Sequence, residues 1–114
     1  MELYKLVFFV PNDAAEGVKE KIFETGAGAI GNYSKCSWEC QGVGQFLPNG
    51  NANPTVGCSD VLEKVSELKV EILCSEVNIK SACEALFEAH PYEEPAYEII
   101  SIYNYDQIKT RLKD

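Results

Sequence analysis

The stretch that decides the fold is LKVEILCSEVNIKSACEALFEAHPYEEPAYEIISIY, residues 68–103. At its start, apolar side chains at every second position alternate with Lys69 and Glu71, the period of a strand with one buried face. From 79 to 87, apolar residues recur at spacings of three and four, which predicts an amphipathic helix. Pro91 ends that helix, because the residue before a proline is pushed out of helical geometry. Tyr97–Tyr103 then predicts another strand.

The first half of the chain begins with the same kinds of element. Leu3–Val10 is a nearly continuous apolar run and predicts a central strand. A stripe of apolar residues predicts a helix over about 13–25, and Gly26 ends it in the usual role of a helix-terminating glycine. Ile30–Gln41 and Val43–Leu47 predict two strand runs with a glycine turn between them. A short helix is predicted over 107–112.

This order of strands and helices favours one fold class. The order is strand, helix, strand pair, strand, helix, strand. It predicts an α+β protein of the ferredoxin-like type, with two helices on one face of an antiparallel sheet. The whole chain, 1–114, is predicted to be one domain. The residues expected in the core are Val7, Phe9, Val18, Ile22, Val70, Ile72, Leu86 and Ile100.

Composition and charge exclude several classes of function. The 10 basic residues against 18 acidic ones give a net charge of −8, so the chain lacks the basic footprint of nucleic-acid or anionic-membrane binding. No run approaches the roughly 18 apolar residues of a membrane span, and the first strand lacks the basic start of a signal peptide. Five cysteines, an odd number, favour reduced thiols and a cytoplasmic location.

Two short segments carry unusual residue patterns. The first, Gly26-Ala27-Gly28-Ala29-Ile30-Gly31-Asn32-Tyr33, is glycine-rich. A dinucleotide fingerprint needs a strand before the glycines and a helix after them, and here the order is reversed. This segment therefore predicts tight turns or close packing of the backbone.

The second segment, His90-Pro91-Tyr92-Glu93-Glu94-Pro95-Ala96-Tyr97, is a short loop with two prolines, and it holds the only histidine of the chain. One interpretation is a binding or metal site built from His90 with Glu93 or Glu94. The other is a helix-ending turn in which His90 caps carbonyl groups and the glutamates are solvated. The residues alone leave both interpretations open.

Together these segments resemble a known module, the PII/CutA-like domain inserted in YqfO-type, NGG-interacting-factor-three-like proteins. Besides the two segments, the matching residues are Cys36-Ser37, Gly42-x-Gly44-x-Phe46-x-Pro48, Glu63-x-Val65 and Leu68-x-Val70-Glu71. The resemblance runs from Leu3 to about Ile102. It implies a stand-alone version of that insert domain with the PII/CutA-like form of the ferredoxin-like fold. It also implies a homotrimer, because CutA and PII proteins form trimers by sheet-edge packing.

Three functions follow as hypotheses. The first is a small non-enzymatic oligomeric module that binds a small molecule or protein partner and has a regulatory or assembly role. It is favoured because full-length family members carry their two-metal hydrolase site in a flanking domain that this sequence does not contain. The second is a divalent-metal-binding protein in the manner of CutA. The third is an enzyme that uses His90 with Glu93 or Glu94 as an acid/base pair.

The predicted site residues can be grouped by these hypotheses. The candidate metal ligands are His90, Glu93 and Cys36, with Cys40 and Cys58 also considered. Cys36 and Cys40 lie ~13 Å apart on an extended strand, too far to share one zinc ion. For ligand binding, the His90 loop is predicted to pack against the glycine-rich turn, with two tyrosines as walls and two glutamates at the mouth, which suits a cation or a hydrogen-bond donor. The residues of this predicted site are His90, Tyr92, Glu93, Glu94, Gly28 and Tyr33.

Overall fold

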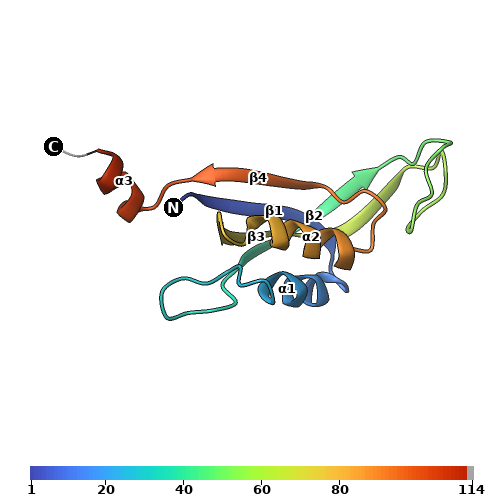
Figure 1. Cartoon of the computed structure of the whole chain (residues 1–114). Helices are drawn as coiled ribbons and strands as arrows, with labels where there is room; N and C mark the ends of the chain where they lie inside the picture. Colours follow the sequence, from blue (N-terminus) through green and yellow to red (C-terminus); the bar gives the residue numbers. More distant parts are fainter. Residues whose placement is uncertain (113–114) are drawn as a thin grey trace.

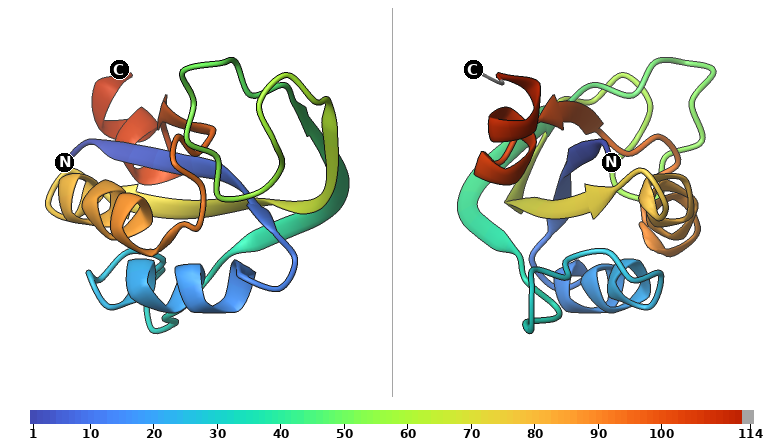
Figure 2. Two further views of the ribbon diagram at one scale, coloured as in Figure 1. Left: turned by 90° about the vertical axis from the view of Figure 1, so that its right-hand side faces the viewer. Right: turned by 60° about the vertical axis from the view of Figure 1, so that its left-hand side comes forward.

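A computed structural model of the chain describes residues 1–112 and has four strands and three helices. In chain order they are β1 (Leu3–Pro11), α1 (Ala15–Phe23), β2 (Trp38–Phe46), β3 (Glu63–Ser75), α2 (Ile79–Ala89), β4 (Tyr97–Ile102) and α3 (Tyr105–Arg111). The strands form one antiparallel sheet in the order β2-β3-β1-β4. Both α1 and α2 lie on one side of this sheet (Figures 1 and 2). The predicted fold class is confirmed.

The core lies between the sheet and these two helices. Apolar side chains of the two central strands meet those of the helix faces, and they are almost fully buried: Leu6, Phe8, Val10, Val70, Ile72, Cys74, Val18, Ile22, Ala82 and Leu86. Of the residues predicted to be buried, six are, namely Val7, Val18, Ile22, Val70, Ile72 and Leu86. Burial of this apolar surface is the main force that holds the helices to the sheet.

The prediction that Ile100 is buried is wrong, because it is 45% exposed, whereas Phe9 is intermediate in exposure. Phe9 pairs with Lys69 and Ile100 with Lys5, so their side chains lie on the face away from the helices, which we call the open face. In the described part of the chain neither α1 nor α2 covers that face. Ile100 is also on β4, at the edge of the sheet.

The predicted strand over 30–41 is wrong in its first part. Residues 30–37 form a compact turn region in which Ile30 and Tyr33 make a reciprocal pair of backbone hydrogen bonds. Gly28 has a φ of +81° and Gly31 a φ of +56°, which favour turning over extension. The predicted turn at 42–44 is also absent, because β2 pairs with β3 without a break from Trp38 to Phe46.

The C-terminal helix α3 lies beyond the end of β4, away from the other helices (Figure 1). Asn104 caps it by accepting a hydrogen bond from the backbone N–H of Gln107, and Gln107 reaches back to Asn104. The helix therefore begins slightly before the predicted range, 107–112. None of the helices within residues 1–112 has the length and apolar character that crossing a membrane requires.

Candidate functional site

The loop after α2 is held in place by the side chain of His90. The helix ends at Ala89, and His90 itself is extended, as the following proline predicts. The imidazole is 6% exposed and turns back toward β1. Its Nε2 lies 2.7 Å from the carbonyl oxygen of Phe9, and its Nδ1 lies 3.0 Å from the backbone nitrogen of Tyr92. His90 thus ties the loop to the sheet.

These two partners fix the protonation of the ring. The carbonyl can only accept a hydrogen bond and the Tyr92 N–H can only donate one, so His90 is neutral with its proton on Nε2. Burial lowers the pKa of His90 below its ordinary value, against opposing effects from the Phe9 carbonyl and the Glu67 carboxylate. Both ring nitrogens are engaged in hydrogen bonds with the backbone. This arrangement supports the interpretation of His90 as a capping residue of the loop and not as a metal ligand.

Next along the loop, Tyr92 makes a hydrogen bond with a residue of β3. Its hydroxyl donates to Oε2 of Glu67 at 2.6 Å, and its ring packs against Phe46 of β2 with centroids 5.6 Å apart. Burial, then the hydrogen bond to the Glu67 carboxylate, raises the pKa of Tyr92 far above its ordinary range. The phenol is therefore a permanent donor to this carboxylate.

Glu67 is a charged residue type in an unusual place. It is 8% exposed and lies on the open face, where it pairs with Gly42 and Pro11 across the sheet. A Cβ built on Gly44 would overlap Oε1 of Glu67. The absent side chain of Gly44 therefore makes the room that the carboxyl group occupies.

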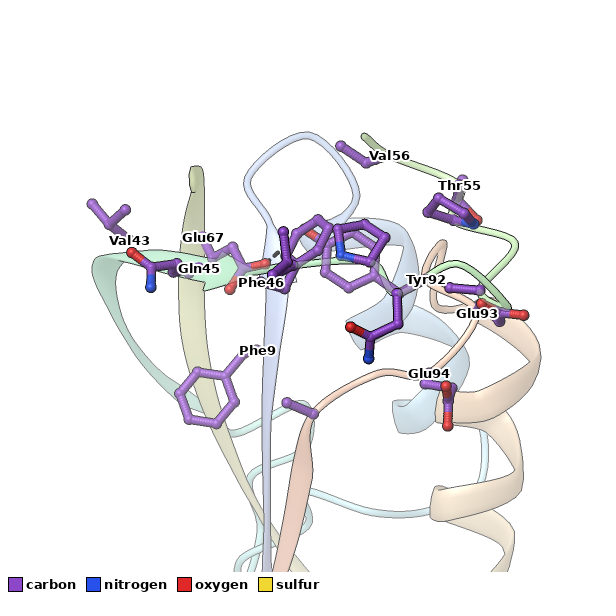
Figure 3. A pocket seen from close by; sticks show the side chains of 17 residues that line it. Phe9, Val43, Gln45, Phe46, Thr55, Val56, Glu67, Tyr92, Glu93 and Glu94 are labelled. Atoms are coloured by element: carbon purple, nitrogen blue, oxygen red, sulfur yellow. Dashed lines mark hydrogen bonds between the residues drawn. The ribbon is translucent and has the colours of Figure 1, made fainter. Parts of the chain in front are cut away.

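Around this pair lies a pocket of about 490 Å³ at the end of the open face (Figure 3). Its aromatic walls are Phe9, Phe46 and Tyr92. The long loop between β2 and β3 forms another side, and its Asn53 N–H donates to Oε1 of Glu93 at 3.1 Å. The remaining residues that line it include Val43, Gly44, Pro48, Pro54, Val56, Glu67, Glu94 and Ala96.

The predicted packing of the His90 loop against the glycine-rich turn is wrong. Gly28 donates its N–H to the carbonyl of Leu73, which pairs with Lys5 on β1, whereas His90 bonds Phe9. These anchor points lie four residues apart on β1, ~13 Å. Figure 1 shows the two connections at opposite ends of the sheet. The helices run antiparallel to one another, so their C-terminal ends cannot meet.

The predicted site residues are accordingly divided. Tyr92, Glu93 and Glu94 line the pocket. His90 lies behind it and supports it without lining it. Gly28, which bonds the Leu73 carbonyl, and the exposed Tyr33, which bonds Ile30, belong to the connection at the other end of the sheet.

The predicted metal ligands do not come together. Cys36 lies in the turn at the far end, where its N–H donates to the Gly28 carbonyl, and both nitrogens of His90 bond the backbone. Within residues 1–112, no three His, Cys, Asp or Glu side chains are grouped so as to hold a metal ion. All five cysteines are free thiols, and burial raises the pKa of Cys74 to about 11.

Sequence reasoning missed the residues that β2 and β3 contribute to the pocket. Glu67 fits the polar half of the alternation of its strand, as Lys69 and Glu71 do, so nothing local marks it as buried, and it is far in sequence from the His90 loop. The signal that was present is the pair Gly44 and Phe46, a glycine inside a strand next to an aromatic residue, which often marks a place of close approach. The burial of Glu67 itself depends on the register between β2 and β3.

Comparison with known proteins gives both relatives and structural neighbours. A protein of Halalkalibacterium halodurans named GTP cyclohydrolase 1 type 2 homolog is 43% identical over 102 residues, which are 90% of this chain and 27% of the relative. A protein of that name from Mycobacterium tuberculosis is 42% identical over 101 residues, 89% of this chain and 27% of the relative. The chain thus spans about a quarter of the length of these relatives. No protein-family model matches it.

Solved structures agree with the sequence matches. The Bacillus cereus protein related to NIF3 aligns with a TM-score of 0.77 and 36% identity, over 90% of this chain and 26% of that one. The periplasmic divalent cation tolerance protein CutA from Archaeoglobus fulgidus aligns with a TM-score of 0.64 and 13% identity, over 90% and 85%. GlnK of B. subtilis, in complex with ATP, aligns with a TM-score of 0.58 and 13% identity, over 90% of this chain and 84% of that one. The last two likenesses concern the fold alone.

Proposed function

Because the chain belongs to the family of the PII/CutA-like domain of NIF3-related, YqfO-type proteins, we propose that it acts as a self-associating binding and regulatory module and not as an enzyme. The relatives' name refers to proteins of which this chain spans 27%. The only acid/base pair that the sequence suggested is not available, because His90 is committed to Phe9 and Tyr92. A cytoplasmic location, with reduced thiols, is part of this proposal.

The observation that carries self-association is the exposure of apolar side chains on both edge strands. On β2, Trp38 is 56% and Val43 72% exposed, and on β4, Ile99 is 48% and Ile100 45% exposed. Monomeric proteins usually protect sheet edges with charges or a covering element. Closed assembly of identical copies would cover these edges.

The charges near β2 do not protect it. Lys35 lies in the preceding turn and binds Glu20 of α1, and Glu39, the one charged residue of β2, binds Lys19 at 2.9 Å. Both are therefore directed to the helix side. We propose a homotrimer, the assembly that the resemblance to CutA and PII proteins implies.

Light scattering coupled to size-exclusion chromatography tests this directly. We expect a mass three times 12.7 kDa. The double variant Trp38→Glu, Ile100→Lys places charges on the two edge strands and is expected to give monomers. Val77→Lys is the matched control, because Val77 is 75% exposed but lies outside both edges. A wild-type mass of 12.7 kDa at working concentration would contradict the proposal.

Divalent-metal binding is the alternative, favoured by the name of the A. fulgidus neighbour. Within residues 1–112 of one copy, no three His, Cys, Asp or Glu side chains are grouped so as to hold an ion. Such a site would therefore need ligands from a second copy. Elemental analysis of the purified assembly decides between the two: less than one metal ion per three chains contradicts the alternative, and a stoichiometric ion supports it.

A further inference from the structure

The pocket contains a buried carboxyl group with an unused oxygen. Glu67 is more than nine-tenths buried, and its Oε2 accepts the Tyr92 hydroxyl. Its Oε1 has no hydrogen-bond or ion-pair partner among residues 1–112, and it is not sealed from the pocket that Glu67 lines. A carboxylate withdrawn from water is costly unless a donor or a cation compensates it. The tyrosine supplies one bond and leaves room for a second.

The charges around the pocket have one sign. Glu67, Glu93 and Glu94 line it, while no lysine, arginine or histidine does. Opposite charges attract more strongly in a partly enclosed, apolar site than in bulk water. A phosphate or carboxylate ligand would meet repulsion here, and a cation would be drawn in.

The rest of the lining is apolar and aromatic. Phe9, Phe46 and Tyr92 present ring surfaces, and Figure 3 shows the Glu67 carboxylate beside the Phe46 and Tyr92 rings. Aromatic faces attract cations, and they also cover apolar ligand surface. The volume of about 490 Å³ suits a small organic molecule. A bare metal ion would find too few ligands.

We propose that this pocket binds a small organic cation, a primary ammonium or guanidinium group on an apolar body. The cation lies at Oε1 of Glu67, and the body lies among Phe9, Phe46 and Tyr92. This inference deepens the proposed binding module. It does not depend on the mass of the assembly, so the two can fail separately.

The probe is phenethylammonium, titrated into the assembled, isotope-labelled full chain and followed by amide chemical shifts. We expect saturable shifts of the Gly44, Glu67 and Tyr92 amides with a Kd near or below about 1 mM. The neutral phenethyl alcohol should bind at least about tenfold more weakly, which corresponds to ~1.4 kcal/mol. The anion phenylacetate should cause no saturable shift at these amides.

Three variants locate the cation. Glu67→Gln removes the charge and keeps an acceptor for Tyr92, and it should weaken phenethylammonium at least about tenfold. Gly44→Ala keeps the charge but displaces the carboxyl group, and it should weaken binding as well. Glu88→Gln, on the exposed face of α2, changes net charge equally and should leave binding unchanged.

Several results would overturn the inference. Equal binding of the amine and the alcohol would mean that the carboxylate is not used. Equal loss in Glu67→Gln and Glu88→Gln would reduce the effect to net charge. Shifts confined to other surfaces, or no saturation at all, would mean that the pocket does not take this class of ligand.

Discussion

The connection from α1 to β2 and the connection from α2 to β4 differ in how they are held. In the first, backbone groups bond one another: Gly28 with Leu73 and Cys36, and Ile30 with Tyr33. In the second, side chains make the anchoring hydrogen bonds: His90 bonds the Phe9 carbonyl of β1, and Tyr92 bonds Glu67. Backbone bonds need glycine for close approach, whereas side-chain bonds bring polar groups into the interior. The second connection thereby encloses the Glu67 carboxyl group and lines the pocket around it.

The largest effect is expected in the backbone-held connection. Gly28→Ala would place a Cβ 2.9 Å from both the Cys36 oxygen and the Phe23 ring, at a φ of +81°. We expect the free energy of unfolding to fall by about 2–4 kcal/mol, from backbone strain and overpacking together. Urea denaturation measures this loss.

Gly31→Ala is the control for this change. Gly31 also has a positive φ, +56°, but a Cβ there would have nothing within 4 Å. Only the left-handed backbone is then penalised, at about 1–2 kcal/mol. Equal losses at the two glycines would show that close packing at Gly28 contributes nothing.

The side-chain-held connection should respond next. His90→Ala leaves the Phe9 carbonyl and the Tyr92 N–H without their partner, and a buried unsatisfied polar group costs about 1–3 kcal/mol. We expect a loss of that order in urea denaturation and faster hydrogen exchange of the Tyr92 amide. His90→Gln, which has both a donor and an acceptor, should recover part of the loss. A change below about 0.5 kcal/mol would class His90 with ordinary surface positions.

A smaller difference is expected between two tyrosines of the two connections. Tyr92→Phe deletes the hydroxyl that donates to Glu67 and should cost about 0.5–1.5 kcal/mol. Tyr33→Phe deletes a hydroxyl on a side chain that is 75% exposed, and it should stay within about 0.5 kcal/mol of wild type. Thermal denaturation of both variants in parallel measures the contrast. If the two variants were equally stable, the Tyr92–Glu67 bond would have no net value.

Much of the fold was predictable from local patterns. The period-two alternation of β3 and the helical spacing in α2 are strong because one face of each element packs in the core, and Pro91 marks the end of α2. The exposure of Ile100 was not predictable in this way, because an apolar residue on an open face has the same local pattern as a buried one. Face assignment needs the other layers of the fold.

The candidate site was predictable only in part, for a related reason. Tyr92, Glu93 and Glu94 are adjacent in sequence, so a proline-framed loop suggested them. Glu67 joins them only through the register of β3 with β1 and β2, which a single sequence does not specify. The predicted contact between the His90 loop and Gly28 was wrong because the two antiparallel helices end at opposite ends of the sheet.

The smallest effect is a pH dependence confined to the side-chain-held connection. The folded-state pKa of His90 is lowered, first by burial, while the Glu67 carboxylate and the Phe9 carbonyl pull it back upward. The unfolded chain therefore takes up a proton as the pH falls below about 6.5, before the folded chain does. The stabilisation that comes from the lowered pKa of His90 is therefore complete above that pH and is lost below it. The free energy of unfolding then falls by no more than about 1.4 kcal/mol per pH unit. Urea denaturation between about pH 7.5 and about pH 5.5 should show this slope in wild type and a shallower one in His90→Gln. In wild type, the protection factor of the Tyr92 amide, its exchange rate relative to an unfolded amide at the same pH, should fall more on acidification than that of the Gly28 amide, whose connection has no histidine. Identical slopes for the two proteins, or an equal fall in protection at both amides, would show that His90 does not set the response.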